Sequence, residues 1–140
     1  MSGARPVLLD TCAAIWLANG DTISAEAKIT ITTAQRENAG VYVSPMTVWE
    51  IATLVAKSRL QLALSPKAWF DTLLDLPGVR LAAMPPSVLI ESATLPGRPP
   101  NDPVDRIIAA TARTFGYSII TRDGELMIYA RAGHIEAIAC

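Results

Sequence analysis

Short apolar runs alternate along the chain with longer segments whose apolar residues recur at helical spacing. The runs at 7–9, 41–43, 79–83, 117–121 and 135–139 predict five buried strands. The segments between them predict helices over 12–19, 25–38, 45–58, 66–76, 85–95, 103–115 and 124–131. The third helix carries an apolar stripe at i, i+3, i+4 and i+7, formed by Val48, Ile51, Ala52 and Val55.

Several helix boundaries carry their own signals. Ser44-Pro45 and Ser65-Pro66 each place a capping residue before a proline at the first helical position. Gly116 is suited to ending the helix before the fourth strand. Because strands alternate with helices, we expect an α/β fold, in which helices cover both faces of a mainly parallel five-stranded sheet. With 140 residues and no visible repeat or linker, the chain is expected to form one domain.

The composition supports a core but argues against binding nucleic acid by bulk charge. Hydrophobic residues make up 51% of the chain, enough for a core without disulfides or structural metals. The net charge is −1, so any contact with RNA would need a local basic patch, a metal ion or a second subunit.

The cysteines and the single histidine predict no zinc or disulfide framework. Cys12 and Cys140 lie far apart in sequence and form no CxxC pair, and His134 could complete a zinc site only with help from carboxylates. We expect Cys12 to be a small core residue. Reduced thiols and the lack of a signal peptide or membrane-spanning segment favour a cytoplasmic location.

Acidic residues recur where the predicted strands end. Asp10 directly follows the first strand, Glu50 lies in the second turn of the helix after the second strand, and Asp123 comes just after the fourth strand. The helix that leads into the fourth strand begins with Asp102 and carries Asp105 in its first turn. Ligands of open parallel sheets bind outside the carboxyl ends of the strands, where these acids would gather.

Each acid also has a purely structural explanation. Asp10 could form an Asx turn, Glu50 could be a solvated helix residue, and Asp123 could cap the last helix. Asp105 could simply favour the helix dipole, although the small Ala109 and Ala112 beside it would leave room for a ligand. For Asp102, followed by proline, helix capping is the preferred interpretation.

Convergence of four acids would nevertheless need a counter-charge. Carboxylates that crowd together raise one another's pKa unless a cation lies between them. Oxygen ligands without histidine or cysteine select a hard ion such as Mg²⁺ or Mn²⁺. Such an ion can support hydrolysis of a phosphodiester bond.

The chain resembles the PIN-domain ribonucleases, and among them the VapC toxins of bacterial type II toxin–antitoxin modules. The likeness spans nearly the whole chain, and it is the combination and order of its motifs that make it specific. The matching segments are VLLDTCAAIW (7–16), VSPMTVWEIATLVAKSRL (43–60), DPVDRIIAATARTFGYSIITRD (102–123) and the closing strand.

This resemblance implies a single PIN domain over residues 1–140 and a set of site residues. Asp10, Glu50 and Asp105 match the family's first three acids, and Asp123 matches a fourth, more variable one. All four are implied to be catalytic and metal-binding, with Thr11 and Thr121 in support. Asn101 departs from the histidine that many relatives carry there.

The same resemblance implies an activity and partners. Family members cleave RNA with Mg²⁺ or Mn²⁺, typically form homodimers, and are inhibited by a VapB-like antitoxin. We therefore predict an endoribonuclease toxin of this kind, with no membrane association. Its phosphate-binding rim could include Lys57, Arg59, Arg98, Arg106 and Arg122, although each could instead be a solvated surface charge.

Other functions fit the sequence less well. A phosphatase of the haloacid dehalogenase type needs Asp-x-Asp after the first strand, but here the residues are Asp10-Thr11-Cys12. A receiver domain needs an acidic pair after its first strand, and this pair is absent here. A catalytically inactive PIN-like module, acting through protein contacts alone, remains the alternative.

Overall fold

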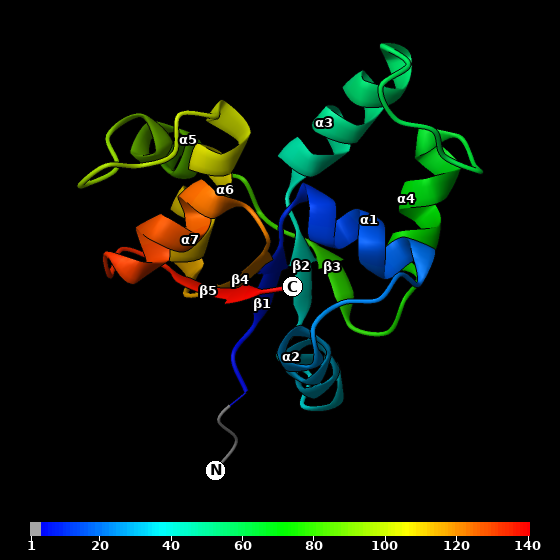
Figure 1. Ribbon diagram of the computed structural model, residues 1–140, viewed down its shortest axis with the longest axis horizontal. Helices are drawn as coiled ribbons and strands as arrows, with labels where there is room; N and C mark the ends of the chain where they lie inside the picture. Colours follow the sequence, from blue (N-terminus) through cyan, green and yellow to red (C-terminus); the bar gives the residue numbers. More distant parts are fainter. Residues whose placement is uncertain (1–3) are drawn as a thin grey trace.

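The computed structural model describes residues 4–140, in which five strands and seven helices follow one another in the predicted order (Figure 1). The elements are β1 (Val7–Leu9), α1 (Thr11–Asn19), α2 (Ala25–Arg36), β2 (Val41–Val43), α3 (Pro45–Ala56), α4 (Pro66–Leu74), β3 (Val79–Leu81), α5 (Pro86–Ala93), α6 (Pro103–Phe115), β4 (Ser118–Thr121), α7 (Gly124–Arg131) and β5 (Glu136–Ala139).

The predicted elements are confirmed, but several end earlier than expected. Helices α2 and α3 stop two residues before the predicted ends, near Asn38 and Ser58, whose φ angles are 56° and 57°. A residue in this left-handed region ends a helix and turns the chain away from it. Strand β3 likewise ends at Leu81 instead of residue 83.

The strands form one parallel sheet in the order β3-β2-β1-β4-β5. From β1 the chain moves outward to β2 and β3, and then crosses to the other side of β1 to form β4 and β5. The carboxyl end of β1, next to β4, is therefore the topological switch point of the sheet, where open α/β folds bind their ligands.

Alternate residues of β1 supply the two halves of the core. Val7 and Leu9 pack with the cluster formed by α1, α2 and α4, whereas Leu8 packs with the cluster formed by α5, α6 and α7. All three side chains have 0% exposure. The sheet thus lies between two helical layers, visible on opposite sides of the strands in Figure 1, as expected for a three-layer α/β/α fold.

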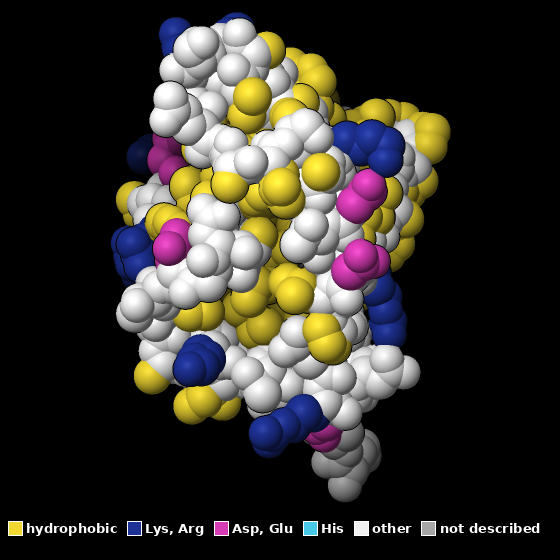
Figure 2. All heavy atoms as spheres, turned by 90° about the vertical axis from the view of Figure 1, so that its right-hand side faces the viewer, with side chains coloured by type: hydrophobic (Ala, Val, Ile, Leu, Met, Phe, Trp, Pro, Cys, Tyr) yellow, Lys and Arg dark blue, Asp and Glu magenta, His cyan; other side chains and the backbone are white. Residues whose placement is uncertain are grey.

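The face seen in Figure 2 is hollowed at its centre, where hydrophobic side chains are visible and charged ones lie toward the margins. Partly buried apolar residues around α1 and α3 pack against the core and include Trp16, Val48, Val55, Leu60 and Leu62. Within residues 4–140, no helix is long and apolar enough to cross a membrane.

Candidate active site

Asp10 is fixed at the switch point by both of its carboxylate oxygens. It is the N-cap of α1, where Oδ1 accepts a hydrogen bond from the backbone N–H of Ala13 at 2.8 Å. Its Oδ2 accepts from the hydroxyl of Thr121 at 2.5 Å, across from β1 to β4. With only 4% exposure, this carboxylate is buried, so the capping role and the predicted site position coexist in one residue.

The Thr121 hydroxyl joins two of the predicted acids. It donates to Asp10 and accepts a hydrogen bond from the backbone N–H of Asp123 at 2.9 Å. Asp123 in turn caps α7, because its Oδ2 accepts from the backbone N–H of Leu126. The fully buried Thr121 therefore sets the positions of both acids.

At the start of α6, Asp102 caps the helix, whereas the carboxylate of Asp105 is left without a partner in residues 4–140. Asp102 Oδ1 accepts from the backbone N–H of Val104 at 2.7 Å and from that of Asp105 at 3.4 Å, which confirms the predicted cap. The carboxylate of Asp105 makes no hydrogen bond or ion pair with residues 4–140 and is only partly buried. It remains free to bind a ligand.

Glu50 lies in the second turn of α3, a helix that contacts both α1 and α6. One turn earlier, the fully buried Thr47 places its hydroxyl oxygen 3.3 Å from that of Thr11 at the start of α1. This contact ties the helix that carries Glu50 to the helix that follows Asp10. Thr47 was not among the residues predicted from the sequence, although its position three residues before Glu50 was an available signal.

The pKa values report how strongly the acids interact. Burial raises the pKa of Asp105 from 3.8 to about 7, with further increases from Asp123, Asp102, Asp10 and Glu50. Burial also raises the pKa of Asp10, against the lowering effect of its two hydrogen bonds. The charged groups that shift these two pKa values most are all carboxylates, so negative charge gathers around Asp10 and Asp105.

The exposure of Cys12 corrects one prediction, and its electrostatic surroundings agree with the predicted gathering of the acids. Cys12 was expected in the core, but it is exposed, because the second residue of α1 faces the acidic edge of the sheet. Although the residue is exposed, partial burial of its thiol is the main reason that the pKa of the thiol is raised, and Asp10, Glu50, Asp105 and Asp123 all raise it further. The four predicted acids thus act electrostatically on the same point.

The acids differ in how firmly they are held. Hydrogen bonds fix Asp10 and Asp123, whereas the side chains of Glu50 and Asp105 have no hydrogen-bond partner within residues 4–140. In that part of the chain, no three Asp, Glu, Cys or His side chains are arranged to hold a metal ion as they stand. The all-oxygen donor set and the unbalanced charge nevertheless fit a hard divalent cation such as Mg²⁺ or Mn²⁺.

The five predicted rim cations have different surroundings. Arg106 donates from Nε to the carbonyl of Pro100 at 2.8 Å and from Nη1 to that of Ser92 at 3.3 Å, so it anchors the loop before α6. Arg98 is exposed in that loop, and Lys57 and Arg59 are exposed beyond the C-terminal end of α3, away from Ser44. Arg122 is exposed and lies in sequence between Thr121 and Asp123.

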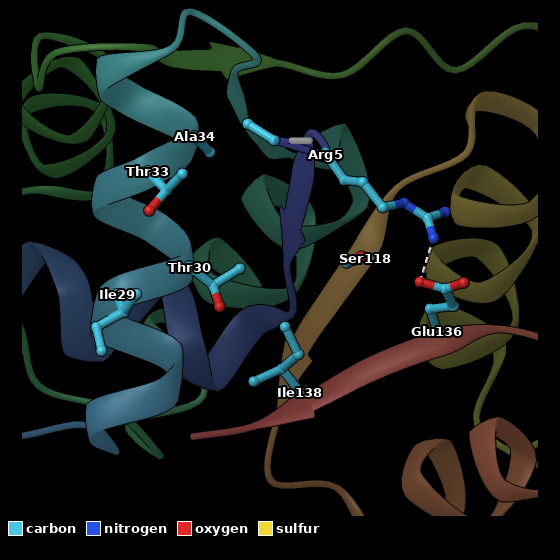
Figure 3. A pocket seen from close by; sticks show the side chains of 9 residues that line it. Arg5, Ile29, Thr30, Thr33, Ala34, Ser118, Glu136 and Ile138 are labelled. Atoms are coloured by element: carbon cyan, nitrogen blue, oxygen red, sulfur yellow. Dashed lines mark ion pairs between the residues drawn. The ribbon is translucent and has the colours of Figure 1, made fainter. Parts of the chain in front are cut away.

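A cavity of about 340 Å³ lies at the opposite, amino end of the strands (Figure 3). Helix α2 contributes Ile29, Thr30 and Thr33 to its wall, while β4 and β5 contribute Ser118 and Ile138. Arg5 and Glu136 form an ion pair at this cavity. None of the predicted site residues lines it.

Comparisons with known proteins agree with this architecture. The family model described as PIN domain matches residues 7–132. Ribonuclease VapC22 of Mycobacterium tuberculosis is 34% identical over 121 residues, covering 86% of this chain and 88% of that protein.

Solved structures with a similar fold include a chain of the VapBC2 complex from Rickettsia felis bound to a promoter DNA fragment. Its TM-score is 0.64 and its identity 12%, covering 96% of this chain and 98% of that one. A chain of the DNA-bound VapBC complex from Salmonella typhimurium gives a TM-score of 0.59 at 16% identity, with the same coverage. At these identities the likeness concerns the fold.

Proposed function

Because this chain belongs to the PIN-domain family, we propose that it is a metal-dependent endoribonuclease and the toxin of a VapBC-type toxin–antitoxin module. The observation that carries the proposal is the cluster of carboxylates at the switch point of the sheet, where burial and, beyond it, neighbouring carboxylates raise the pKa values of Asp10 and Asp105. The 34% identity to a protein named as a ribonuclease supports the same activity.

Asp10, Glu50, Asp105 and Asp123 would hold Mg²⁺ or Mn²⁺. When bound, this cation supplies positive charge that stabilises the transition state of phosphodiester hydrolysis. The chain's own contribution is to hold two of these carboxylates in place. Thr121 and the backbone N–H of Ala13 hold Asp10, and Thr121 and Leu126 hold Asp123 through its backbone N–H and its carboxylate.

The supporting threonines position the remaining part of the site. The contact between Thr11 and Thr47 keeps α3 against α1, so Glu50 stays on the same edge of the sheet as Asp10. The carboxylates of Glu50 and Asp105, which lack partners within residues 4–140, can turn toward a ligand without breaking a hydrogen bond.

The proposed partners follow from the relatives. RNA is the substrate implied by the name of VapC22, and a VapB-like antitoxin is implied by the VapBC complexes with a similar fold. We further propose a homodimer that acts in the cytoplasm. The low overall charge favours such an assembly, because two subunits would combine their few basic residues near one substrate.

Cleavage of single-stranded RNA by the purified protein tests the proposal. Wild-type protein should cleave with Mg²⁺ or Mn²⁺ and lose activity in EDTA, and Asp10→Asn should be inactive although asparagine can still cap α1. Asp75→Asn, a change at an exposed acid ending α4, is the matched control and should cleave normally. Hydrolysis by water should leave 5′-phosphate ends. Equal activity of the wild type and Asp10→Asn would reject the assigned site, and no cleavage by either would favour the inactive module.

A further inference from the structure

Arg122 differs from the other four predicted rim cations because it is both held in place and left with both terminal nitrogens free within residues 4–140. We propose that Arg122, supported by Trp16, binds a phosphate group of the RNA strand next to the bond that is cleaved. This inference rests on the proposed ribonuclease function and names a substrate-binding residue for it.

Two contacts fix the Arg122 side chain. Its guanidinium carbon lies 4.0 Å from the centre of the Trp16 ring on α1, a cation–π contact. Its Nε donates a hydrogen bond to the backbone carbonyl of Cys140 at 2.9 Å. Because the long side chain is already ordered, binding a ligand would cost less conformational entropy than it does for a mobile surface arginine.

These contacts leave the two terminal nitrogens of Arg122 available. Neither Nη group makes a hydrogen bond or an ion pair with residues 4–140, although Asp123 is the next residue in the chain. The residue is exposed despite the contacts of its guanidinium. A planar guanidinium with both Nη groups free presents the fork of donors that matches the oxygens of a phosphate.

The charges around Arg122 explain why the site needs such a residue. A polyanionic strand that approaches Asp10, Glu50, Asp105 and Asp123 meets like charges, and the net charge of the chain offers no general attraction. Arg106 is already bonded to two backbone carbonyls. Arg122 follows Thr121, the residue that holds Asp10. Besides burial, the main cause, Asp10 raises and Arg122 lowers the pKa of the Cys140 thiol, so both charges act on one group at the carboxyl end of the sheet.

A cavity next to Trp16 gives the neighbouring nucleotide room. It has a volume of about 340 Å³ and contains both apolar side chains and the cation of Lys28. It therefore offers apolar contact for a base, and Asp21 in its lining offsets the charge of Lys28, so Arg122 remains the cation that is proposed to bind the phosphate. Its lining residues are Trp16, Leu17, Gly20, Asp21, Thr22, Ile23 and Lys28.

Binding of a fluorescent single-stranded RNA to the inactive Asp10→Asn protein, with Mg²⁺ held constant, tests the inference. Adding Arg122→Ala should raise Kd about tenfold, as expected for one charge-assisted contact, and should reduce the slope of log K against log salt by about 0.7. The matched control is Arg131→Ala at the C-terminal end of α7, which should change Kd less than about twofold, because its charge is remote from the acids.

Two further variants separate phosphate binding from a purely structural role. Arg122→Gln can keep the hydrogen bond to Cys140 but loses the charge, so it should bind RNA as weakly as Arg122→Ala even if the alanine variant is less stable. Trp16→Leu should weaken binding, and combining it with Arg122→Ala should add little, because both changes act on the same contact.

The inference is overturned if Arg122→Gln and Arg131→Ala bind RNA equally well, or if the salt dependence does not change. Cleavage assays with proteins that keep Asp10 distinguish a failure of this inference from a failure of the proposed function. If wild type cleaves RNA and Arg122→Gln leaves KM unaltered, only the role of Arg122 is wrong. If wild type neither binds nor cleaves RNA, the proposed function itself fails and the inference fails with it.

Discussion

The two ends of the parallel sheet use polar side chains in opposite ways. At the amino end, the negative charge of Glu136 is paired with Arg5. At the carboxyl end, burial raises the pKa values of Asp10 and Asp105, and nearby carboxylates raise both values further. The ion pair at the amino end balances its own charges. The repulsion between the acids at the carboxyl end can be relieved by protonation or by a bound cation.

Helix geometry explains why the acids gather at one end only. In a parallel sheet with helical crossovers, the carboxyl ends of the strands lead into helix N-termini, where backbone N–H groups favour acidic caps. Asp10, Asp102 and Asp123 are such caps. Side chains that begin the helices therefore also supply negative charge to the proposed site, so folding and function favour the same residues there.

Removing site acids should have the largest effect on activity. We expect Glu50→Gln and Asp105→Asn each to lower the rate of Mg²⁺-dependent RNA cleavage about 100-fold or more, equivalent to about 3 kcal/mol in activation free energy. The corresponding change at the amino end, Glu136→Gln, should leave the rate within about twofold, because a surface charge this remote from the reaction is screened. Comparable losses for all three variants would contradict a site confined to the carboxyl end.

Thr121 should come next, because its hydroxyl contacts two acids. Thr121→Val leaves the buried Oδ2 of Asp10 without its donor and should destabilise the fold by about 1–3 kcal/mol, with a loss of cleavage. Thr121→Ser keeps the hydroxyl and should preserve activity. Ser118→Ala, at the other end of the same strand, is the control for denaturant unfolding, and an equal loss there would show that the hydroxyl of Thr121 has no special role.

The stability of the folded protein should depend on pH through Asp105. Because the pKa of Asp105 rises from 3.8 to about 7 on folding, the metal-free folded protein binds a proton that the unfolded chain releases between these values. The stabilising contribution is complete below pH 3.8 and is lost as pH rises through about 7. At pH 8, Asp105→Asn should therefore be more stable than the wild type by about 1–2 kcal/mol after solvent screening.

Urea unfolding of EDTA-treated protein at pH 4 and pH 8 measures this effect. The advantage of Asp105→Asn should shrink at the lower pH. Added Mg²⁺ at pH 8 should stabilise the wild type more than the variant, because the cation replaces the proton as the counter-charge. A variant that is no more stable than the wild type at pH 8 would show that the folded protein does not disfavour the ionised carboxylate of Asp105.

The smallest effect is expected at the amino end. Arg5→Ala removes an ion pair between partly exposed side chains and should cost less than about 1 kcal/mol in thermal unfolding. RNA cleavage should be unchanged, since neither Arg5 nor Glu136 belongs to the acidic cluster. A cleavage defect in this variant would mean that the two ends of the sheet are coupled.

The sequence predicted the fold well because its signals are local. Strands and helices were recognisable from apolar periodicity and from pairs such as Ser44-Pro45, which caps α3 as expected. The errors lie mainly at element ends, as at Asn38 and Ser58, where a single left-handed residue stops a helix and neither residue type requires that conformation.

The candidate site could be predicted only in part. Strand order places Asp10 and Asp123 at one edge, and their hydrogen bonds to Thr121 agree with that placement. The contacts of Arg122 with Trp16 and Cys140 were not predictable, because they join segments distant in sequence. The exposure of Cys12 was missed because an apolar neighbourhood in sequence does not reveal which side of a short helix faces the site.

Isothermal titration of Mn²⁺ into the metal-free protein tests the central claim most directly, because it needs no RNA and no knowledge of the target. We expect saturable binding to the wild type, loss of that binding in Asp10→Asn and Asp105→Asn, and unchanged binding in Glu136→Gln. If the wild type binds no Mn²⁺, or if Asp10→Asn and Asp105→Asn bind it as the wild type does, the carboxylate cluster is not a metal site.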